Sequence, residues 1–148
     1  MPTKEELNDL AYLVRGAGLR VHQKLGPGCF ESAYVPCFAY ELGQLGIQFR
    51  ARVPLTLRYE TVVVPRAYEL DFLIAGWIVI EVKALEKLSP VHSRQLDTYL
   101  KLTGCPLGFI FNFGAPNFLG GVVRRVNEFP NGSTPLSTLG DEMIEAGY

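Results

Sequence analysis

The chain has 148 residues, 48% hydrophobic and 20% charged, a balance typical of one globular domain. Its formal net charge of -1 provides no overall basic field and argues against a tight, sequence-specific DNA binder, although a local basic groove stays possible. Its cysteines (Cys29, Cys37 and Cys105) form no C-x-x-C pair, so they indicate neither a disulfide framework nor a zinc site. Because the N-terminus is charged and no apolar run approaches ~20 residues, we expect a cytoplasmic protein without a membrane span.

The N-terminal segment predicts a long helix. Thr3 and Glu6 have the spacing of a capping box, in which each residue bonds the other's backbone N–H. Apolar residues then recur at helical spacing from Leu7 to Leu25. The Gly-Pro-Gly sequence at residues 26–28 combines a helix-ending glycine with a proline, so the helix is expected to end there.

Residues 30–45 predict a second helix, although Pro36 falls inside it. Proline lacks a backbone N–H and is best tolerated in the first turn of a helix. We therefore expect the regular part of this helix to begin only near Val35.

The pattern changes to strands from Ile47 onward. Residues 47–59, IQFRARVPLTLRY, alternate in part and are rich in β-branched and aromatic residues. Glu60-Thr61 predicts a turn, and a second extended segment follows at residues 62–74, where Pro65 favours an edge position or a bulge. WIVIEVKA, at residues 77–84, predicts a third strand.

A third helix and a fourth strand follow. Ser89 is expected to cap the helix, with Pro90 at its first position, residues 91–102 helical and Gly104 beyond its end. The segment LGFIFNFG, at residues 107–114, is apolar along its whole length. This pattern is typical of a strand that is covered on both faces.

The predicted domain comprises residues 1–127, and residues 128–148 are expected to form a C-terminal tail. VVRRV, at residues 122–126, predicts a fifth strand, and the tail is rich in Pro, Gly, Ser and Thr, with a short helix considered at residues 141–146. The order helix, helix, three strands, helix, strand, strand indicates an α/β fold: a mixed sheet with helices on both faces.

The segment DFLIAGWIVIEVK carries charged residues in an apolar hairpin. Glu81 and Lys83 are two residues apart on one strand, so both point to one face of the sheet. Whether Asp71 joins them depends on the loop. A two-residue Ala75-Gly76 turn puts Asp71 on the opposite face, whereas an odd loop centred on Gly76 places it directly across from Glu81.

In that odd register, two carboxylates meet across the sheet. Like charges in this position are destabilising, and burial adds to the cost. A divalent cation removes the cost by taking oxygen ligands from both acids, and Lys83 can steady a hydroxide or a phosphate oxygen beside them. The alternative is structural: Glu81 and Lys83 form a solvated strand face, and Asp71 begins a strand.

Two motifs resemble known families. Asp71, separated by nine residues from Glu81-Val82-Lys83, resembles the core motif of the PD-(D/E)XK nuclease superfamily. VHQKLGPGCFESAY, from Val21 to Tyr34, resembles the signature of the GxxExxY proteins, with Gly28, Glu31 and Tyr34 at the named positions. Further matches in VPLTLRY, VHSRQLDTYLKLTG and LGFIFNFG extend the resemblance from about residue 7 to 126. It implies a three-layer α/β/α core with a mixed central sheet, of the restriction-endonuclease-like type.

The resemblance also implies a metal site. Asp71 and Glu81 would ligate Mg²⁺, with Mn²⁺ as a substitute, and Lys83 would position or activate water. An acid on an early helix often completes such sites, and Glu31 holds that position here. For Glu31 the alternative is a favourable interaction with the dipole of the helix that it begins.

Polar residues near these motifs are further candidates. Gln95 and Tyr99 match a Q-x-x-x-Y motif like that of RecB-type nucleases, and the resemblance assigns them to the catalytic set; alternatively, with His92 they form a solvent-facing stripe. His92 and His22 are accessory candidates. For His22 the alternative is a core histidine with satisfied hydrogen bonds or one that interacts with the helix dipole.

Two functions stay open at the level of sequence. The first is a Mg²⁺-dependent nuclease that hydrolyses phosphodiester bonds of DNA or RNA. The second is a non-catalytic module that binds nucleic acid or a protein partner, including a second copy of itself. No P-loop, G-x-G-x-x-G or Ser/His/Asp arrangement competes with these, so we expect no other cofactor.

Overall fold

The computed structural model describes residues 2–127, so the predicted tail at 128–148 lies outside the described residues. The helices are α1 (Lys4–Leu25), α2 (Glu31–Gln44), α3 (Pro90–Thr103) and the short 3-10 helix η1 (Leu119–Gly121). The strands are β1 (Phe49–Tyr59), β2 (Val62–Ile74), β3 (Ile78–Lys83), β4 (Leu107–Asn112) and β5 (Val122–Val126). Each predicted helix and strand within residues 2–127 is therefore present.

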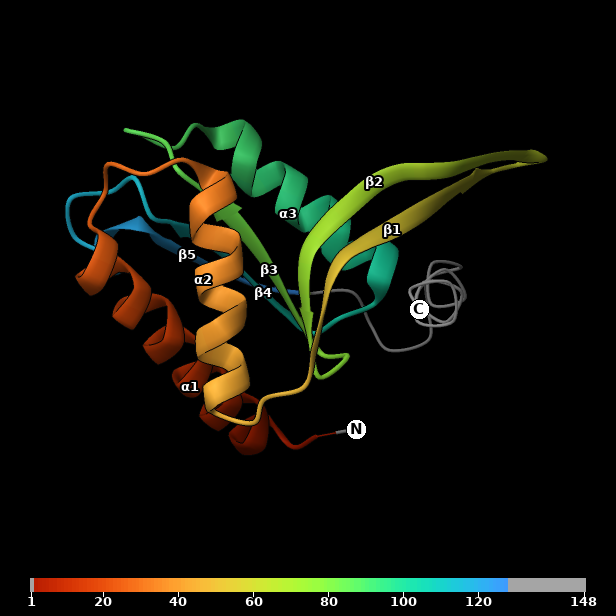
Figure 1. The fold of residues 1–148 in the computed structure, drawn as a ribbon. Coiled ribbons are helices and arrows are strands. Elements are labelled where there is room, and N and C mark those ends of the chain that lie inside the picture. Colours follow the sequence, from red (N-terminus) through yellow and green to blue (C-terminus); the bar gives the residue numbers. More distant parts are fainter. Residues whose placement is uncertain (1, 128–148) are drawn as a thin grey trace.

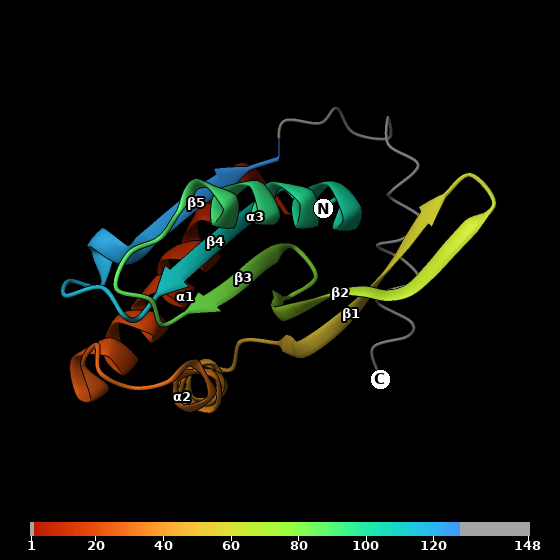
Figure 2. The same cartoon turned by 90° about the horizontal axis from the view of Figure 1, so that it is seen from above.

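The strands form one mixed sheet in the order β1-β2-β3-β4-β5. Neighbouring strands are antiparallel except β3 and β4, which are parallel and connected through α3. Helices α1 and α2 cover one face of the sheet and α3 covers the other (Figures 1 and 2). The predicted three-layer α/β fold is confirmed. Among residues 2–127, no helix has the length and hydropathy needed to cross a membrane.

The ends of α1 follow the sequence signals. The backbone N–H of Glu6 donates to Oγ1 of Thr3 at 3.1 Å, and that of Thr3 donates to Oε2 of Glu6 at 2.8 Å, so the capping box is present. The helix ends before Gly26, whose φ of 69° lies in the left-handed region that glycine adopts readily. The buried face of α1 packs through small and branched residues, including Val14 and Ala17.

Helix α2 begins at Glu31, which corrects the prediction that its regular part starts near Val35. Pro36 lies inside the helix and forfeits one backbone hydrogen bond, to the carbonyl of Ser32. That cost falls close to the start of the helix, and burial of Tyr34 and Phe38 against the sheet offsets it.

Strands β1 and β2 form a hairpin whose outer part extends beyond the rest of the sheet (Figure 1). Their register shifts between Leu55 and Leu57, opposite the segment that contains Pro65, where an irregularity was expected. Strand β4 lies between β3 and β5, and all six of its residues are buried, which confirms that both of its faces are covered. Gly108 lies beneath the side chains of Leu96 and Leu100 of α3.

Candidate active site

The register of β2 and β3 decides whether the two predicted carboxylates meet. Ile74 pairs with Ile78, and Phe72 pairs with Ile80, so the connecting loop contains an odd number of residues. Ala75 and Gly76 both adopt left-handed φ angles, of 52° and 79°, which reverses the chain tightly. The same register brings Asp71 level with Glu81. Of the two loops that the sequence left open, the odd loop around Gly76, which the carboxylate site requires, is the one observed.

The backbone ladders are interrupted at Asp71. The β2–β3 pairing ends at Phe72–Ile80, and the β1–β2 pairing passes over Asp71 and Arg52, whose φ is 53°. Hydrogen bonds that the carboxylates accept from the backbone take the place of the ladder. Val82 N–H donates to Oδ2 of Asp71 at 2.8 Å, and Asp71 N–H donates to Oε1 of Glu81 at 3.2 Å. Each carboxylate is thereby fixed against the opposite strand.

Burial and mutual repulsion oppose the ionisation of both carboxyl groups, Asp71 and Glu81. Glu81 is only 6% exposed. Burial, followed by the negative charge of Asp71, raises the pKa of Glu81 to about 8. Burial also raises the pKa of Asp71; the nearby charge of Glu31 adds to this, whereas the Val82 N–H and the positive charge of Lys83 oppose it. Lys83 also favours the ionised form of Glu81.

The end of β3 that carries Lys83 is fixed by β4. Phe113 N–H donates to the Lys83 carbonyl at 2.8 Å. The buried side chain of Asn112 accepts from the N–H of Leu85 and donates to the carbonyl of the same residue, both at 2.9 Å. The sequence analysis did not identify Asn112; the available signal was one amide side chain in an otherwise apolar strand.

Glu31 lies at the first position of α2 and is exposed. Three residues later, the hydroxyl of Tyr34 donates to the Gly26 carbonyl and accepts from Cys29 N–H at 3.1 Å, which ties the α1–α2 turn to α2. The charge of Glu31 raises the pKa of both Asp71 and Glu81, so its carboxylate lies near theirs. Even so, no group of three or more His, Cys, Asp or Glu within residues 2–127 is arranged to hold a metal ion.

The two α3 candidates differ in their surroundings. Tyr99 is buried, with its ring centroid 5.6 Å from that of Tyr68 in an edge-on contact. Burial raises its pKa, and the negative charges of Glu81 and Asp71 raise it further, so its hydroxyl lies near the carboxylate pair. Gln95, one turn earlier on α3, has an exposed side chain. Of the polar stripe predicted on α3, Tyr99 therefore belongs to the core and Gln95 to the surface.

Comparison with known proteins identifies the family of the chain. A model of the PD-(D/E)XK nuclease superfamily matches residues 8–126, well over half of the chain. The chain belongs to the PD-(D/E)XK nuclease superfamily. The match includes all of the site candidates described above. No curated protein and no solved structure matches the chain significantly.

The two histidines of this PD-(D/E)XK protein have structural contacts. The Nε2 atom of His22 lies 2.7 Å from the carbonyl oxygen of Ala115, and its ring contacts Phe118 on the α1 side of the sheet. This is the satisfied core histidine that the sequence left open as the alternative. His92 accepts the Ser89 N–H on Nδ1 at 3.0 Å and so caps the start of α3.

The carboxylate pair suits a hard divalent cation. One oxygen of each acid accepts a backbone N–H, and the other makes no hydrogen bond within residues 2–127. Half-buried Asp71 and buried Glu81 repel each other; burial raises the pKa of both carboxyl groups, and this repulsion raises the pKa of Glu81 further. Oxygen donors of this kind favour Mg²⁺ or Mn²⁺ over zinc. The donor set of this PD-(D/E)XK site therefore fits the ion that its family implies.

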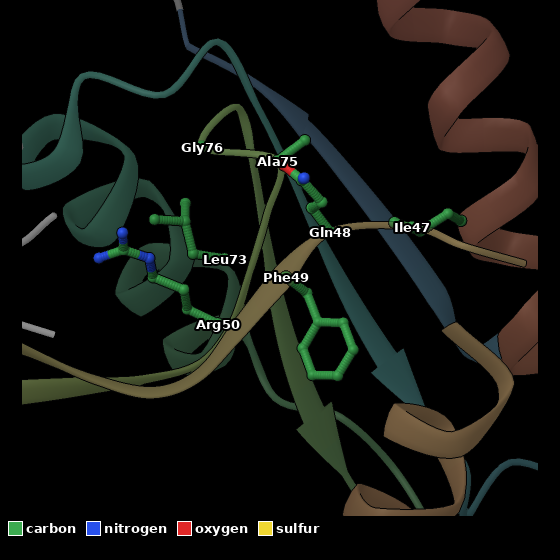
Figure 3. Close-up of a pocket in the computed structure, with 7 residues that line it drawn as sticks. All are labelled: Ile47, Gln48, Phe49, Arg50, Leu73, Ala75 and Gly76. Carbon is green, nitrogen blue, oxygen red and sulfur yellow. The ribbon is translucent and has the colours of Figure 1, made fainter. Parts of the chain in front are cut away.

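A separate cavity lies at the opposite end of β3. It has a volume of about 640 Å³ and is lined by Ile47, Gln48, Phe49, Arg50, Leu73, Ala75 and Gly76. In Figure 3, Arg50 and Leu73 extend to one side of the strands and Phe49 to the other. Because this cavity borders the β2–β3 loop, whereas Glu81 and Lys83 lie toward the other end of β3, it is not part of the carboxylate site.

Proposed function

We propose that this PD-(D/E)XK protein is a metal-dependent nuclease that hydrolyses phosphodiester bonds of nucleic acid. The observation that supports this most strongly is the carboxylate pair of half-buried Asp71 and buried Glu81, held level where the β2–β3 pairing ends. Lys83 follows on the same face of β3 as Glu81, by the alternation of strand side chains. Mg²⁺ is the proposed ion, with Mn²⁺ as a substitute.

Each residue of the site would have its own role in the reaction. A bound divalent cation supplies Lewis-acid polarisation of the phosphate and lowers the pKa of water. Asp71 and Glu81 would hold the ion, and Glu31 would add negative charge from the start of α2. The Lys83 ammonium would orient the attacking water and stabilise negative charge that develops on the phosphate oxygens. On α3, the Tyr99 hydroxyl and the exposed Gln95 amide would orient Lys83 or contact a substrate phosphate.

The turn between α1 and α2 supports a finer assignment to the GxxExxY proteins. Tyr34 bonds both ends of this turn, and Glu31 lies one helical turn before Tyr34 on the same helix. The motif therefore has a physical basis: the tyrosine fixes the segment that presents the glutamate to the carboxylate pair. The free thiols of Cys29, Cys37 and Cys105 support a reducing location, for which we propose the cytoplasm.

Cleavage assays test the nuclease proposal directly. The purified chain is incubated with plasmid, single-stranded DNA and RNA, with Mg²⁺, Mn²⁺ or a chelator. We expect cleavage that depends on the ion and falls at least about 100-fold in Lys83→Met and Glu81→Gln, a loss typical of removing a catalytic group. Lys87→Met, a matched change in the exposed loop after β3, should cleave like the wild type. Equal activity in all four proteins would refute the proposal.

A second candidate function is a non-catalytic module that binds nucleic acid through the same scaffold. The specific observation in its favour is that Glu31 does not form a three-ligand group with Asp71 and Glu81 within residues 2–127. This candidate predicts binding of nucleic acid without cleavage, in the presence or absence of divalent ions. Retention of binding in Lys83→Met, with no turnover by the wild type, would favour it over the nuclease.

A further inference from the structure

The exposed side of α1 carries a hollow that the candidate active site does not use. The hollow has a volume of about 370 Å³ and is lined by Tyr12, Leu13, Arg15, Gly16, Leu19, Arg20, Leu45 and Leu119. Most of its lining residues belong to α1, which together with α2 covers the face of the sheet opposite α3 (Figure 1). No residue of the hollow belongs to the carboxylate site.

Gly16 leaves the backbone of α1 uncovered where it lines the hollow. A Cβ atom built at Gly16 would meet only the end of the Arg20 side chain, at 3.9 Å, so the space above it is open. Glycine inside a helix costs stability relative to alanine, and no packing within residues 2–127 requires it at this position. A position that leaves the helix backbone uncovered allows a side chain from outside to approach closely.

The rim of the hollow is apolar and exposed. Tyr12, one turn before Gly16 on the same face of α1, is 70% exposed, and Leu119 is 61% exposed. Leu13 and Leu45 are also large apolar residues exposed at this surface. Clustered exposed apolar side chains around a depression are typical of protein contact surfaces.

The polar groups at the hollow indicate what should cover it. The Nε atom of Arg15 is buried and has no hydrogen-bond partner within residues 2–127. A buried donor of this kind is costly unless an acceptor reaches it. The first turns of α1 carry acids (Glu5, Glu6 and Asp9), and its second half carries Arg15, Arg20 and Lys24, of which Arg20 and Lys24 already pair with Glu41 of α2 at 3.1 and 3.2 Å. Two such helices packed antiparallel bring opposite charges together.

We propose that this surface is the contact between two copies of the chain, related by a two-fold axis with their α1 helices antiparallel. Tyr12 of each copy would enter the hollow over Gly16 of the other, and the acids in the first turns of α1 would lie beside the Arg15 guanidinium group of the other copy. A two-fold contact requires one self-complementary patch, and the tyrosine and the open glycine one turn apart on α1 provide it. The surface is independent of the proposed nuclease function.

Sedimentation velocity tests this contact on the full chain, from about 1 µM to about 500 µM, a range that spans the dissociation constants of weak to moderate dimers. We expect a concentration-dependent dimer for the wild type. Gly16→Leu fills the hollow with a better helix former, and Tyr12→Gln removes the inserted ring. Each is expected to weaken dimerisation at least about tenfold while circular dichroism shows a folded chain. Tyr40→Gln, at an exposed aromatic residue of α2 outside the hollow, should dimerise like the wild type.

Two results would overturn the proposal. A wild type that stays monomeric over the whole range would show that a second copy does not cover the hollow. A dimer that persists unchanged in both Gly16→Leu and Tyr12→Gln would place the contact elsewhere on the molecule.

Discussion

Glu81 is the residue whose environment is most unusual for its chemistry. It is 6% exposed, and its carboxyl group lies beside a second acid. The carboxyl group accepts a hydrogen bond from the backbone N–H of Asp71. Lys83 lowers the pKa of Glu81 but does not outweigh burial and Asp71. Burial of this carboxyl group beside Asp71 raises the free energy of the folded protein, and a divalent cation that binds both acids lowers it.

The raised pKa of Glu81 predicts how stability depends on pH. Between its ordinary value of 4.5 and about 8, the folded chain holds a proton that the unfolded chain releases. The free energy of unfolding should therefore fall as pH rises through this interval in the presence of a chelator. Glu81→Gln should flatten the decline and be more stable than the wild type at pH 8, by a few kcal/mol at about 1.4 kcal/mol per pKa unit.

Urea unfolding from pH 5 to pH 8 measures this dependence. Glu60→Gln, which removes an acid from the exposed β1–β2 turn, serves as the matched control and should keep the wild-type slope. Stability that rises with pH in the wild type, or equal slopes in wild type and Glu81→Gln, would contradict a buried, repelled pair.

At the scale of elements, the site depends on how neighbouring segments end. The β2–β3 ladder stops just before the carboxylates, Asn112 of β4 fixes the chain that leaves β3, and Tyr34 fixes the turn that leads into α2. Gly114 lies so close to the chain after β3 that a Cβ atom there would be 2.3 Å from the Leu85 carbonyl oxygen. Side-chain hydrogen bonds to the backbone and one close backbone approach thus hold the ends of these elements around the site.

Replacing Asn112 should loosen the end of β3. Asn112→Leu keeps the side-chain volume but leaves the Leu85 N–H and carbonyl, just after the end of β3, without their partners. We expect a loss of roughly 2–4 kcal/mol in the free energy of unfolding, measured by urea denaturation. Asn117→Leu makes the same change at an exposed residue and should cost less than about 1 kcal/mol. Similar losses in the two variants would argue against the role of Asn112.

The hydroxyl of Tyr34 should matter separately from its ring. Tyr34→Phe keeps the stacked contact with Phe113, whose centroid is 4.7 Å away, and removes the bonds to Gly26 and Cys29. We expect a loss of about 1–2 kcal/mol in the free energy of unfolding and faster hydrogen exchange at the Cys29 amide. Tyr40→Phe, at an exposed tyrosine of α2, is the control. An unchanged Cys29 exchange rate in Tyr34→Phe would show that the hydroxyl does not hold the turn.

On the scale of the whole molecule, the sequence predicted what depends on local pattern. Capping residues, glycine stops and alternation located every α-helix and strand within residues 2–127, although not the short helix η1, and they reduced the alignment of Asp71 with Glu81 to whether the loop was odd or even. Features that depend on tertiary contacts were not predicted. Helix α2 begins earlier than expected because burial outweighs the cost of Pro36. The burial of Tyr99 and the bonds of Asn112 depend on packing between distant segments.

The proposed function requires Asp71 and Glu81 to act together as one cation site. Calorimetric titration with Mn²⁺ tests this most directly. We expect the wild type to bind the ion with release of protons, more tightly at pH 8 than at pH 6 because the acids must ionise first. Asp71→Asn and Glu81→Gln should each weaken binding by about 10-fold or more, whereas Glu60→Gln should bind like the wild type. Equal Mn²⁺ affinity in all four proteins would contradict the account.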